Sequence, residues 1–326
     1  MWEAVSTFVR DHESFVVTTH INPEADAIGS EVAFAAFLEG QGKKVTIVNS
    51  SATPLDCLFL DGADRIVVYG DDFDQRILDD ADAVVIVDVN NWDHLGPFGE
   101  ELKKRTTPRA CIDHHEEADD GFAEVIVCDT KAAAAGLLVY DFIKFMKAEI
   151  TPVIADAVYT AILTDTGSFR FSNTDQRAFL AAADLCSLGV NPFAIYRKVY
   201  AKSWGASHLV GAALSTLDKN SDGRIAWIYI TQKMLADNGA VYEDSDGLVE
   251  QVRGIEGVEL CLIFKELSDG QVKVSLRSNG KVNAFEIAKS FGGGGHRMAS
   301  GMRLDGPMAD AIKKLVPVCE DRLPSL

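Results

Sequence analysis

The chain has 326 residues, 47% of them hydrophobic, and a formal net charge of -18. This length allows two domains with their own cores, and the negative charge excludes a protein that coats long nucleic acid, because such binding depends on many Lys and Arg contacts to phosphates. No early segment combines basic residues with a long apolar stretch, and no run reaches the apolar length of a membrane span, so we expect a cytoplasmic protein without a membrane segment. The six cysteines are scattered without a C-x-x-C pair. We expect them to be reduced core residues.

Strand and helix signals alternate over the first half of the chain. Helical patterns, such as the one over 29–39, separate short β-rich runs, and we expect strands at 15–19, 45–49, 65–68, 83–88, 110–112 and 124–128. Nearly continuous apolar strands separated by helices are typical of an α/β fold with a mostly parallel sheet. In such sheets, the loops beyond the carboxyl ends of the strands build the functional site.

Metal-binding side chains follow three of these strands. His20 and Asp26 lie in the segment after the first strand, Asp88 closes the fourth, and Asp113-His114-His115 follows the fifth; Asp165 comes later, near the end of an expected helix. Taken alone, each Asp is more often a helix cap or a solvated residue. Four such segments at successive strand or helix ends favour a site for two divalent cations, with Asp88 as the bridge. Three other histidines lack carboxylate neighbours and are expected to be ordinary residues: His12, His94 and His208.

The second half begins with a largely helical stretch, from 131 to about 216, in which Pro152 and Pro192 are expected to start helices. Strand signals return at 224–230, 258–265 and 272–276 and are followed by the run Gly292 to Gly295 and His296. We expect a first domain at 1–200, a semi-rigid helical linker at 201–217 and a smaller α/β domain at 218–326. The glycines would let backbone N–H groups approach a phosphate, with Arg277 and His296 as further donors. A flexible surface turn is the alternative.

In this order, the motifs resemble those of the DHH superfamily of phosphoesterases, in the branch of nanoRNases and phosphoadenosine phosphate phosphatases that joins a DHH domain to a DHHA1 domain. The resemblance covers essentially the whole chain. It rests on His20-x-x-Pro23-Glu24-x-Asp26, Val87-Asp88, Asp113-His114-His115, Thr164-Asp165-Thr166-Gly167 and the run Gly292 to His296.

The resemblance implies two divalent metal ions, usually manganese, and a hydroxide that bridges them and attacks phosphorus. One ion would be held by His20, Glu24 and Asp88, and the other by Asp26, Asp88, His114 and Asp165. Asp113 would orient a metal ligand and His115 would lie near the phosphate or leaving group, as the two further catalytic residues. The DHHA1 residues implied to bind substrate are Arg277, Ser278, Gly293, Gly294, Gly295 and His296.

Two features depart from the family pattern. Most relatives have Asp where this chain has Glu24, and the extra methylene changes the reach to the first metal. The segment Ala132 to Gly136 stands where a more polar Ser/Thr-containing segment is expected. That segment lies outside the metal motifs, so we expect it to affect only local packing or substrate contacts.

The activity that the resemblance implies is hydrolysis of very short oligoribonucleotides to mononucleotides, together with conversion of 3'-phosphoadenosine 5'-phosphate to AMP. Cleavage of cyclic di-AMP or linear pApA is an alternative that the sequence leaves open. An inorganic pyrophosphatase would carry a different second domain, so the glycine run argues against it. A nucleotide-binding regulator without activity is an alternative of another class. The resemblance also implies a homodimer, although no sequence feature demonstrates an interface.

Overall fold

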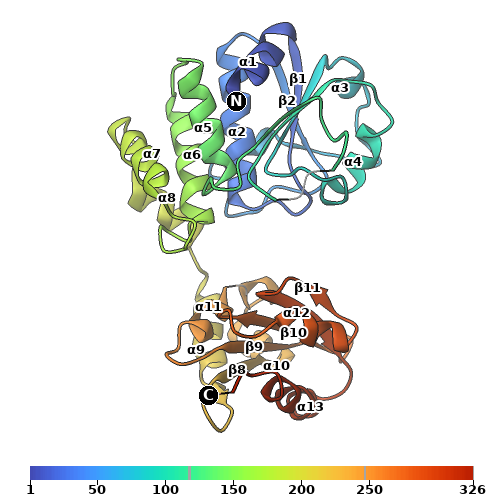
Figure 1. Ribbon diagram of the computed structural model, residues 1–326, viewed down its shortest axis with the longest axis vertical. Helices are drawn as coiled ribbons and strands as arrows, with labels where there is room; N and C mark the ends of the chain where they lie inside the picture. Colours follow the sequence, from blue (N-terminus) through green and yellow to red (C-terminus); the bar gives the residue numbers. More distant parts are fainter. Residues whose placement is uncertain (117–118, 246, 326) are drawn as a thin grey trace. The chain divides into compact units, whose positions relative to one another are not determined.

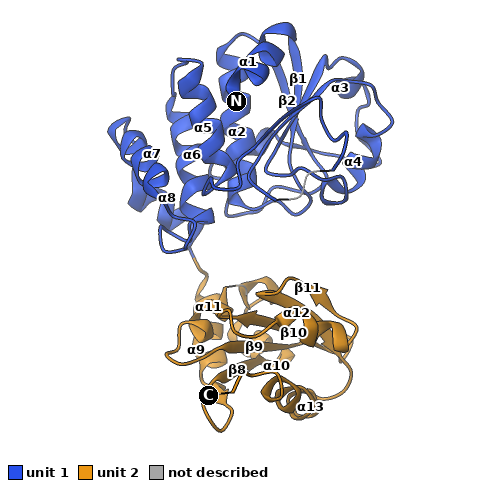
Figure 2. Ribbon diagram, in the orientation of Figure 1, with its two compact units in different colours: residues 1–201 blue, residues 202–326 orange. Residues whose placement is uncertain are grey.

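The computed structural model describes residues 1–116, 119–245 and 247–325 (Figure 1). The chain divides into two compact units, Met1–Ala201 and Lys202–Leu326 (Figure 2). Each unit has its own hydrophobic core. Among the described residues no single helix has the length and apolar character needed to cross a membrane; one pair of helices bent by 111° at 188–191 meets both criteria only when the two are joined.

The first unit is an α/β layer structure. Its strands are β1 (Ser14–Thr18), β2 (Lys44–Asn49), β3 (Val67–Val68), β4 (Ala83–Val87), β5 (Arg109–Asp113) and β6 (Val125–Cys128). Its helices are α1 (Trp2–Asp11), α2 (Ala25–Gly40), α3 (Arg76–Asp79), α4 (Gly96–Leu102), α5 (Ala135–Phe145), α6 (Pro152–Asp165), α7 (Gln176–Ser187) and α8 (Pro192–Val199).

The six strands form one sheet in the order β3-β2-β1-β4-β5-β6, and every pairing in it is parallel. The predicted parallel α/β sheet is therefore confirmed. The strand order reverses at β1, which pairs with β2 on one side and with β4 on the other. In open parallel sheets, the crevice at such a reversal, beyond the carboxyl ends of the strands, is the usual ligand site.

Helices cover both faces of this sheet because successive strand side chains point to opposite faces. Val85 and Val87 of β4 are buried in the core that α1, α2, α5 and α6 cover, whereas Val84 and Ile86 are buried on the side of α3 and α4. The helices α2, α5 and α6 lie side by side in Figure 1 and pack on one another. Packing therefore fixes the positions of the strand ends and of the helices that carry the predicted metal-binding residues.

The second unit is built on a mixed sheet. Its strands are β7 (Asp218–Lys219), β8 (Ile225–Ile230), β9 (Leu260–Glu266), β10 (Val272–Ser278), β11 (Gly294–Gly295) and β12 (Ala299–Leu304). Its helices are α9 (Trp204–Leu214), α10 (Gln232–Asn238), α11 (Leu248–Arg253), α12 (Ala284–Ser290) and α13 (Met308–Glu320). The sheet order is β11-β12-β10-β9-β8-β7, and β8 and β9 are its only parallel pair among the described strands.

The segment predicted as a helical linker contains α9, and Leu209 and Ala213 of this helix are buried in a core of the second unit. The glycine run is not a free turn: Gly294 and Gly295 pair with Gly301 and Ser300 of β12. Neither β11 nor β12 is among the predicted strands, because glycine carries no strand signal and the alternation of Ala299 to Leu304 is weak.

Candidate metal centre

The predicted metal-binding residues come together where β1, β4 and β5 end. His20 lies two residues beyond β1, Asp88 directly follows β4, and Asp113 is the last residue of β5. These strands are neighbours in a parallel sheet, so their carboxyl ends meet at one edge. Two helices complete the group, since Asp26 lies in the first turn of α2 and Asp165 is the last residue of α6.

Asp88 stands between imidazoles that come from different strand ends. Its Oδ2 lies 3.5 Å from His20 Nε2, and its Oδ1 lies 3.4 Å from His114 Nε2 and 3.8 Å from His115 Nδ1. The residue is 5% exposed and has a left-handed backbone, with φ of 59°. That backbone region costs free energy for a residue other than glycine, and such strain is concentrated at functional sites.

His114 joins Asp88 to the residues supplied by the helices. Its Nε2 lies 3.8 Å from Asp26 Oδ2 and 3.9 Å from Asp165 Oδ2. Two sets of three ligand atoms, each set within 4.8 Å, can be drawn from these side chains: Asp88, His114 and His115, and Asp26, His114 and Asp165. The predicted ligand His20 belongs to neither set, although it contacts Asp88.

Burial and the closeness of several carboxylates change the pKa values of the groups in this cluster. Burial raises the pKa of Asp26 well above its usual range, and the neighbouring Asp88 and Asp165 raise it further. Burial also raises the pKa of Asp165 to about 6. Burial lowers the pKa values of the imidazoles, but Asp88 together with the other neighbouring groups outweighs burial and raises these pKa values to about 9 for His20 and about 10 for His114.

The donor set fits divalent cations. Three buried or half-buried carboxylates repel one another, and a cation of charge +2 among them would relieve that repulsion. Asp88 Oδ1 is buried and accepts no well-aligned hydrogen bond from the described residues. An unsatisfied buried carboxylate oxygen is costly unless a ligand or ion meets it. Mixed imidazole and carboxylate donors suit manganese, zinc or magnesium more than a soft metal.

The alanine-rich segment 132–136 organises this centre through its backbone. The carbonyl oxygen of Ala132 lies 3.1 Å from His114 Nδ1, which leaves Nε2 facing the carboxylates. The N–H groups of Ala135 and Gly136, at the start of α5, donate to the two oxygens of Asp26 at 2.8 and 2.9 Å. We expected this segment to matter only for packing or substrate contacts. Sequence reasoning missed its role because backbone groups leave no side-chain signature.

Asp113 is buried and faces His115 rather than the other imidazoles. Its Oδ1 lies 2.8 Å from His115 Nδ1, and this hydrogen bond raises the pKa of His115. The His115 ring is more than half exposed, whereas the His114 ring is mostly covered. Asn90 also holds this loop, because its side-chain N–H donates to the His115 carbonyl at 3.0 Å. Sequence reasoning missed Asn90.

Glu24 lies at the edge of the group. It is exposed, occupies the N-cap position of α2 without a capping hydrogen bond from its side chain, and belongs to neither three-residue set among the described residues. Its negative charge still reaches the centre, since it is among the causes that raise the pKa values of His20 and Asp165. Its assignment as a ligand stays a prediction.

A buried polar chain supports the β1 end of the site. Glu31 of α2 is fully buried, and Asn49 Nδ2 donates to its Oε1 at 2.8 Å. Asn49 Oδ1 in turn accepts from the backbone N–H of Thr19, at 3.3 Å, directly before His20. Burial raises the pKa of Glu31 well above its usual range, which favours the protonated side chain. Neither Glu31 nor Asn49 was singled out from the sequence.

The predicted substrate-binding residues of the second unit lie at one end of its sheet. Arg277 pairs in register with Ala299, and Ser278 N donates to the Met298 carbonyl at 2.9 Å, so both lie beside the turn that joins β11 to β12. A Cβ at Gly293 would lie 2.2 Å from the Gly301 carbonyl oxygen, so this glycine is required by close strand packing. Gly294 has open space instead. His296 is exposed.

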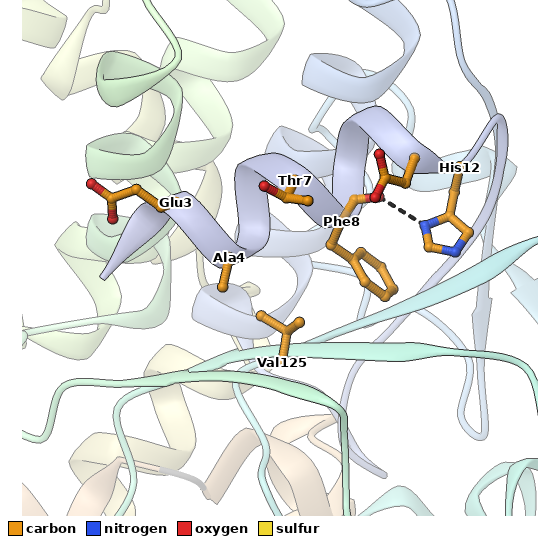
Figure 3. Close-up of a pocket in the computed structure, with 7 residues that line it drawn as sticks. Glu3, Ala4, Thr7, Phe8, His12 and Val125 are labelled. Atoms are coloured by element: carbon orange, nitrogen blue, oxygen red, sulfur yellow. Dashed lines mark hydrogen bonds between the residues drawn. The ribbon is translucent and has the colours of Figure 1, made fainter.

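A separate pocket lies between α1 and β6 and is drawn in Figure 3. Its lining includes Phe8, Val125 and His12, whose Nδ1 bonds to the Phe8 carbonyl at 2.8 Å. None of the predicted metal or substrate residues lines it. His12 lies at this pocket and belongs to neither three-residue set of the metal centre.

Comparison with protein families matches both parts of the chain. The model of the DHH family, N-terminal domain, matches residues 14–162, and the model of the DHHA1 domain matches residues 223–323. The two matches fall within the first and the second unit, respectively.

Individual relatives match over most of their length. The bifunctional oligoribonuclease and PAP phosphatase NrnA of Thermus thermophilus is 32% identical over 290 residues, which cover 89% of this chain and 84% of that protein. The protein of the same name from Bacillus subtilis is 24% identical and is covered to 89%. The crystal structure of an exopolyphosphatase-related protein from Bacteroides fragilis is 27% identical, with a TM-score of 0.91 over 98% of this chain and 95% of that one.

A more distant likeness concerns the fold alone. RecJ of Thermus thermophilus, in complex with Mn²⁺, is 13% identical, with a TM-score of 0.54 over 99% of this chain and 54% of that one. The ordered motifs, the parallel sheet with its cluster of Asp and His at the strand ends, and the two family matches agree. The chain belongs to the DHH/DHHA1 family of phosphoesterases.

Proposed function

We propose that this protein uses two divalent metal ions to hydrolyse very short oligoribonucleotides to mononucleotides and to remove the 3'-phosphate from 3'-phosphoadenosine 5'-phosphate. The observation that carries this proposal is the position of Asp88, whose two oxygens face His20 on one side and His114 on the other. The names of the NrnA relatives support the substrate class. Residues 1–200 would perform the chemistry and residues 218–326 would bind substrate, joined by 201–217.

The ligand sets follow from the family motifs. His20, Glu24 and Asp88 would hold one ion, and Asp26, Asp88, His114 and Asp165 the other. When bound, such ions, for which manganese is a suitable choice, lower the pKa of water and neutralise phosphoryl oxygens. The backbone of 132–136 keeps His114 and Asp26 aimed at the same point.

His115 and Asp113 act on the substrate side of the centre in this proposal. Because Nδ1 of His115 is hydrogen-bonded to Asp113, its Nε2 is the nitrogen left to donate to a phosphate oxygen or to the leaving oxygen. The raised pKa of His115 keeps a proton on that ring more readily near neutral pH. Asp113 thus acts as a positioning residue for a proton donor.

The end of the second sheet would grip the rest of the nucleotide. Gly294 has open space above its backbone, and Arg277 offers a planar fork of N–H donors suited to a phosphate. Gly293, Gly295 and His296 complete the proposed substrate site, and Ser278, which is fully buried and accepts from the Gly280 N–H, would support it from below. A grip on one end of a short substrate limits its length, which agrees with a chain of charge -18 better than the binding of long polymers does.

A substrate panel tests the proposal. The purified chain with Mn²⁺ would be given RNA dinucleotides, longer RNA, 3'-phosphoadenosine 5'-phosphate, cyclic di-AMP, linear pApA and pyrophosphate. We expect rapid hydrolysis of the dinucleotides and of 3'-phosphoadenosine 5'-phosphate. Preference for cyclic di-AMP or pApA would replace these substrates with the cyclic dinucleotide alternative, and consumption of pyrophosphate alone would reject the proposal.

Substitution of Asp88 separates a catalyst from a binding protein. Asp88→Asn keeps the size of the side chain and tolerates a left-handed backbone, but it removes the negative charge. We expect loss of hydrolysis with an unchanged circular dichroism spectrum, and Asp88→Ala should behave alike. Asp71→Ala, at an exposed carboxylate of the same unit, is the matched control. Full activity of Asp88→Asn would show that Asp88 does not join the two ions.

A further inference from the structure

The chain turns sharply just after Asp165, the last residue of α6. Three consecutive residues there are left-handed: Gly167, Ser168 and Phe169, with φ of 55°, 62° and 63°. The N–H groups of Gly167 and Ser168 donate back to Thr164 and Leu163, at 2.9 and 2.7 Å, which closes the helix end. These hydrogen bonds therefore hold the turn against the end of α6, next to the proposed metal ligand Asp165.

Three aromatic side chains lie at this turn or next to it, and we name Phe171, Tyr200 and Tyr196 the aromatic row. The Phe171 ring lies directly on Gly167, where a Cβ would come within 2.4 Å of the ring. Ser168 Oγ donates to the Tyr200 hydroxyl at 3.3 Å. The rings of Tyr196 and Tyr200 are 4.7 Å apart and tilted by 49°. Through Phe171 and Tyr200, the aromatic row thus contacts the turn that directly follows Asp165.

The aromatic row is not part of the core. Helix α8, which packs against α6, buries Ile195 and Val199 on its inner face. Tyr196 and Tyr200 leave 49% and 36% of their surface exposed, and Phe171 leaves 44%. Single exposed aromatic residues are common, but neighbouring ones at one turn form a patch of the kind that binds a ligand.

The segment that carries α8 is basic in a chain that is acidic overall. Residues 190–204 contain three basic residues, Arg197, Lys198 and Lys202, and no acidic one, in a chain of net charge -18. All three basic side chains are exposed, and the nearest acidic group on the packed helix α6 is Asp156, which faces Lys198. A local positive field favours an anionic ligand, and exposed rings favour a ligand with a flat aromatic face. A nucleotide combines both properties.

We propose that the aromatic row stacks on a nucleobase of the substrate whose phosphate is hydrolysed next to Asp165. This inference rests on the proposed function and adds a requirement to it: the substrate is recognised by a base as well as by its phosphates. Every nucleobase has a stacking face, so the aromatic row distinguishes base-bearing nucleotides from other phosphate esters but tolerates different base sequences.

Paired substrates test the stacking. Hydrolysis of an RNA dinucleotide is compared with hydrolysis of two matched dinucleotides, each of which has one base replaced by hydrogen. We expect Tyr196→Ala and Tyr200→Ala to raise KM for the intact dinucleotide by about 10-fold with little change in kcat, since a stacked base contributes roughly that factor. The same variants should have little effect on the dinucleotide that lacks the stacked base. Tyr200→Phe should retain most of the wild-type KM because the ring remains.

The control variant is Phe145→Ala, which removes an aromatic side chain that is 42% exposed at the end of α5 away from the metal centre. It should leave both substrates unaffected. An equal loss on intact and base-free substrates with Tyr200→Ala would show that the aromatic row only supports the turn after Asp165. No loss on any substrate would likewise overturn the inference.

A binding measurement keeps this test independent of the reaction. Calorimetric binding of AMP and of ribose 5-phosphate to the full chain with Mn²⁺ requires no turnover. We expect Tyr200→Ala to weaken AMP binding by about 10-fold and to leave ribose 5-phosphate binding unchanged. If the wild-type chain binds AMP in this way but hydrolyses no dinucleotide, the proposed function fails and the stacking stands. Equal affinity of wild type and Tyr200→Ala for AMP would reject the stacking itself.

Discussion

His114 is oriented by a backbone group of Ala132, whose carbonyl oxygen lies 3.1 Å from His114 Nδ1. Because one ring nitrogen is occupied, only Nε2 faces Asp88, Asp26 and Asp165. A fixed tautomer and ring orientation are what a metal-binding imidazole needs. The same segment fixes Asp26, so two proposed metal ligands from different parts of the chain share one support.

Replacement of His114 by Ala should weaken binding of Mn²⁺ by at least about 10-fold, because loss of a metal ligand is expected to cost no less than loss of a supporting contact. Isothermal titration calorimetry of the metal-free protein with Mn²⁺ measures this change. His94→Ala is the control, since the His94 ring bonds to Asn91 and His94 belongs to neither three-residue set found among the described residues. Equal Mn²⁺ affinity of His114→Ala and wild type would remove His114 from the ligand set.

The sequence predicted the side chains of the centre but not its supports. His20, Asp88 and Asp113 were placed together because they follow apolar strands, and the parallel sheet brings those strand ends to one edge. Ala132 and Gly136 act through backbone groups, and Glu31 sits in a helix whose residues are buried all around. No periodic pattern marks such positions, because what they contact is decided by the packing of α2 and α5.

Glu31 should make the stability of the protein depend on pH. Burial raises its pKa well above the ordinary value of 4.5, so the folded protein keeps a proton on Glu31 that the unfolded chain loses. The stability that this proton provides is complete below about pH 4.5 and is lost as the pH rises toward the folded pKa. Glu31→Gln cannot ionise and should reduce the fall in unfolding free energy between about pH 5 and pH 8. Urea denaturation of the metal-free proteins at several pH values measures the difference.

Glu31→Ala is the informative contrast. It leaves the buried Asn49 side chain without its acceptor, and we expect a loss of about 1–3 kcal/mol at every pH, beyond that of Glu31→Gln. Parallel pH curves for wild type and Glu31→Gln would mean that Glu31 is ionised in the folded protein.

Gly136 should not tolerate even a methyl group. A Cβ at this position would lie 2.4 Å from the Cβ of Ala161 in α6 and 3.4 Å from Asp26 Oδ1. Two helices must therefore separate, and such overpacking typically costs about 1–3 kcal/mol. Gly136→Ala should lower the unfolding free energy by this amount and also weaken Mn²⁺ binding, because the displaced helix holds Asp26. Gly40→Ala, in open space at the end of α2, should not destabilise the protein. A stable Gly136→Ala with normal metal affinity would contradict the close packing.

The fold was predictable where residue patterns were strong. The buried strands β1, β4 and β5 and the proline-started helices α6 and α8 agree with the expected positions to within a residue or two. The run expected as a strand at 65–68 is strand only at Val67–Val68, since Ala63–Arg65 forms a short helical turn. The pairing of Gly294 with Gly301 could not be predicted from the sequence because it depends on close backbone approach between glycines. The predicted homodimer stays a prediction.

Arg177 should stabilise the first unit at neutral pH and lose this effect in acid. It donates to Asp129 at 2.8 Å and to Asp141 at 2.7 Å, and so ties α7 to α5 and to the segment after β6. Hydrogen bonding from Arg177 holds the pKa of Asp129 below its usual range.

The resulting stability is present above the unfolded pKa of about 4 and is lost as the pH falls through the lower folded value. Arg177→Gln should therefore lower the melting temperature more at pH 7 than at about pH 2, because protonation of Asp129 in acid removes its charge-assisted bond to Arg177. Arg76→Gln, which removes an exposed pair with Asp74, should change little at either pH because solvent screens that pair. An equal loss of stability at both pH values for Arg177→Gln would assign its role to packing rather than to charge.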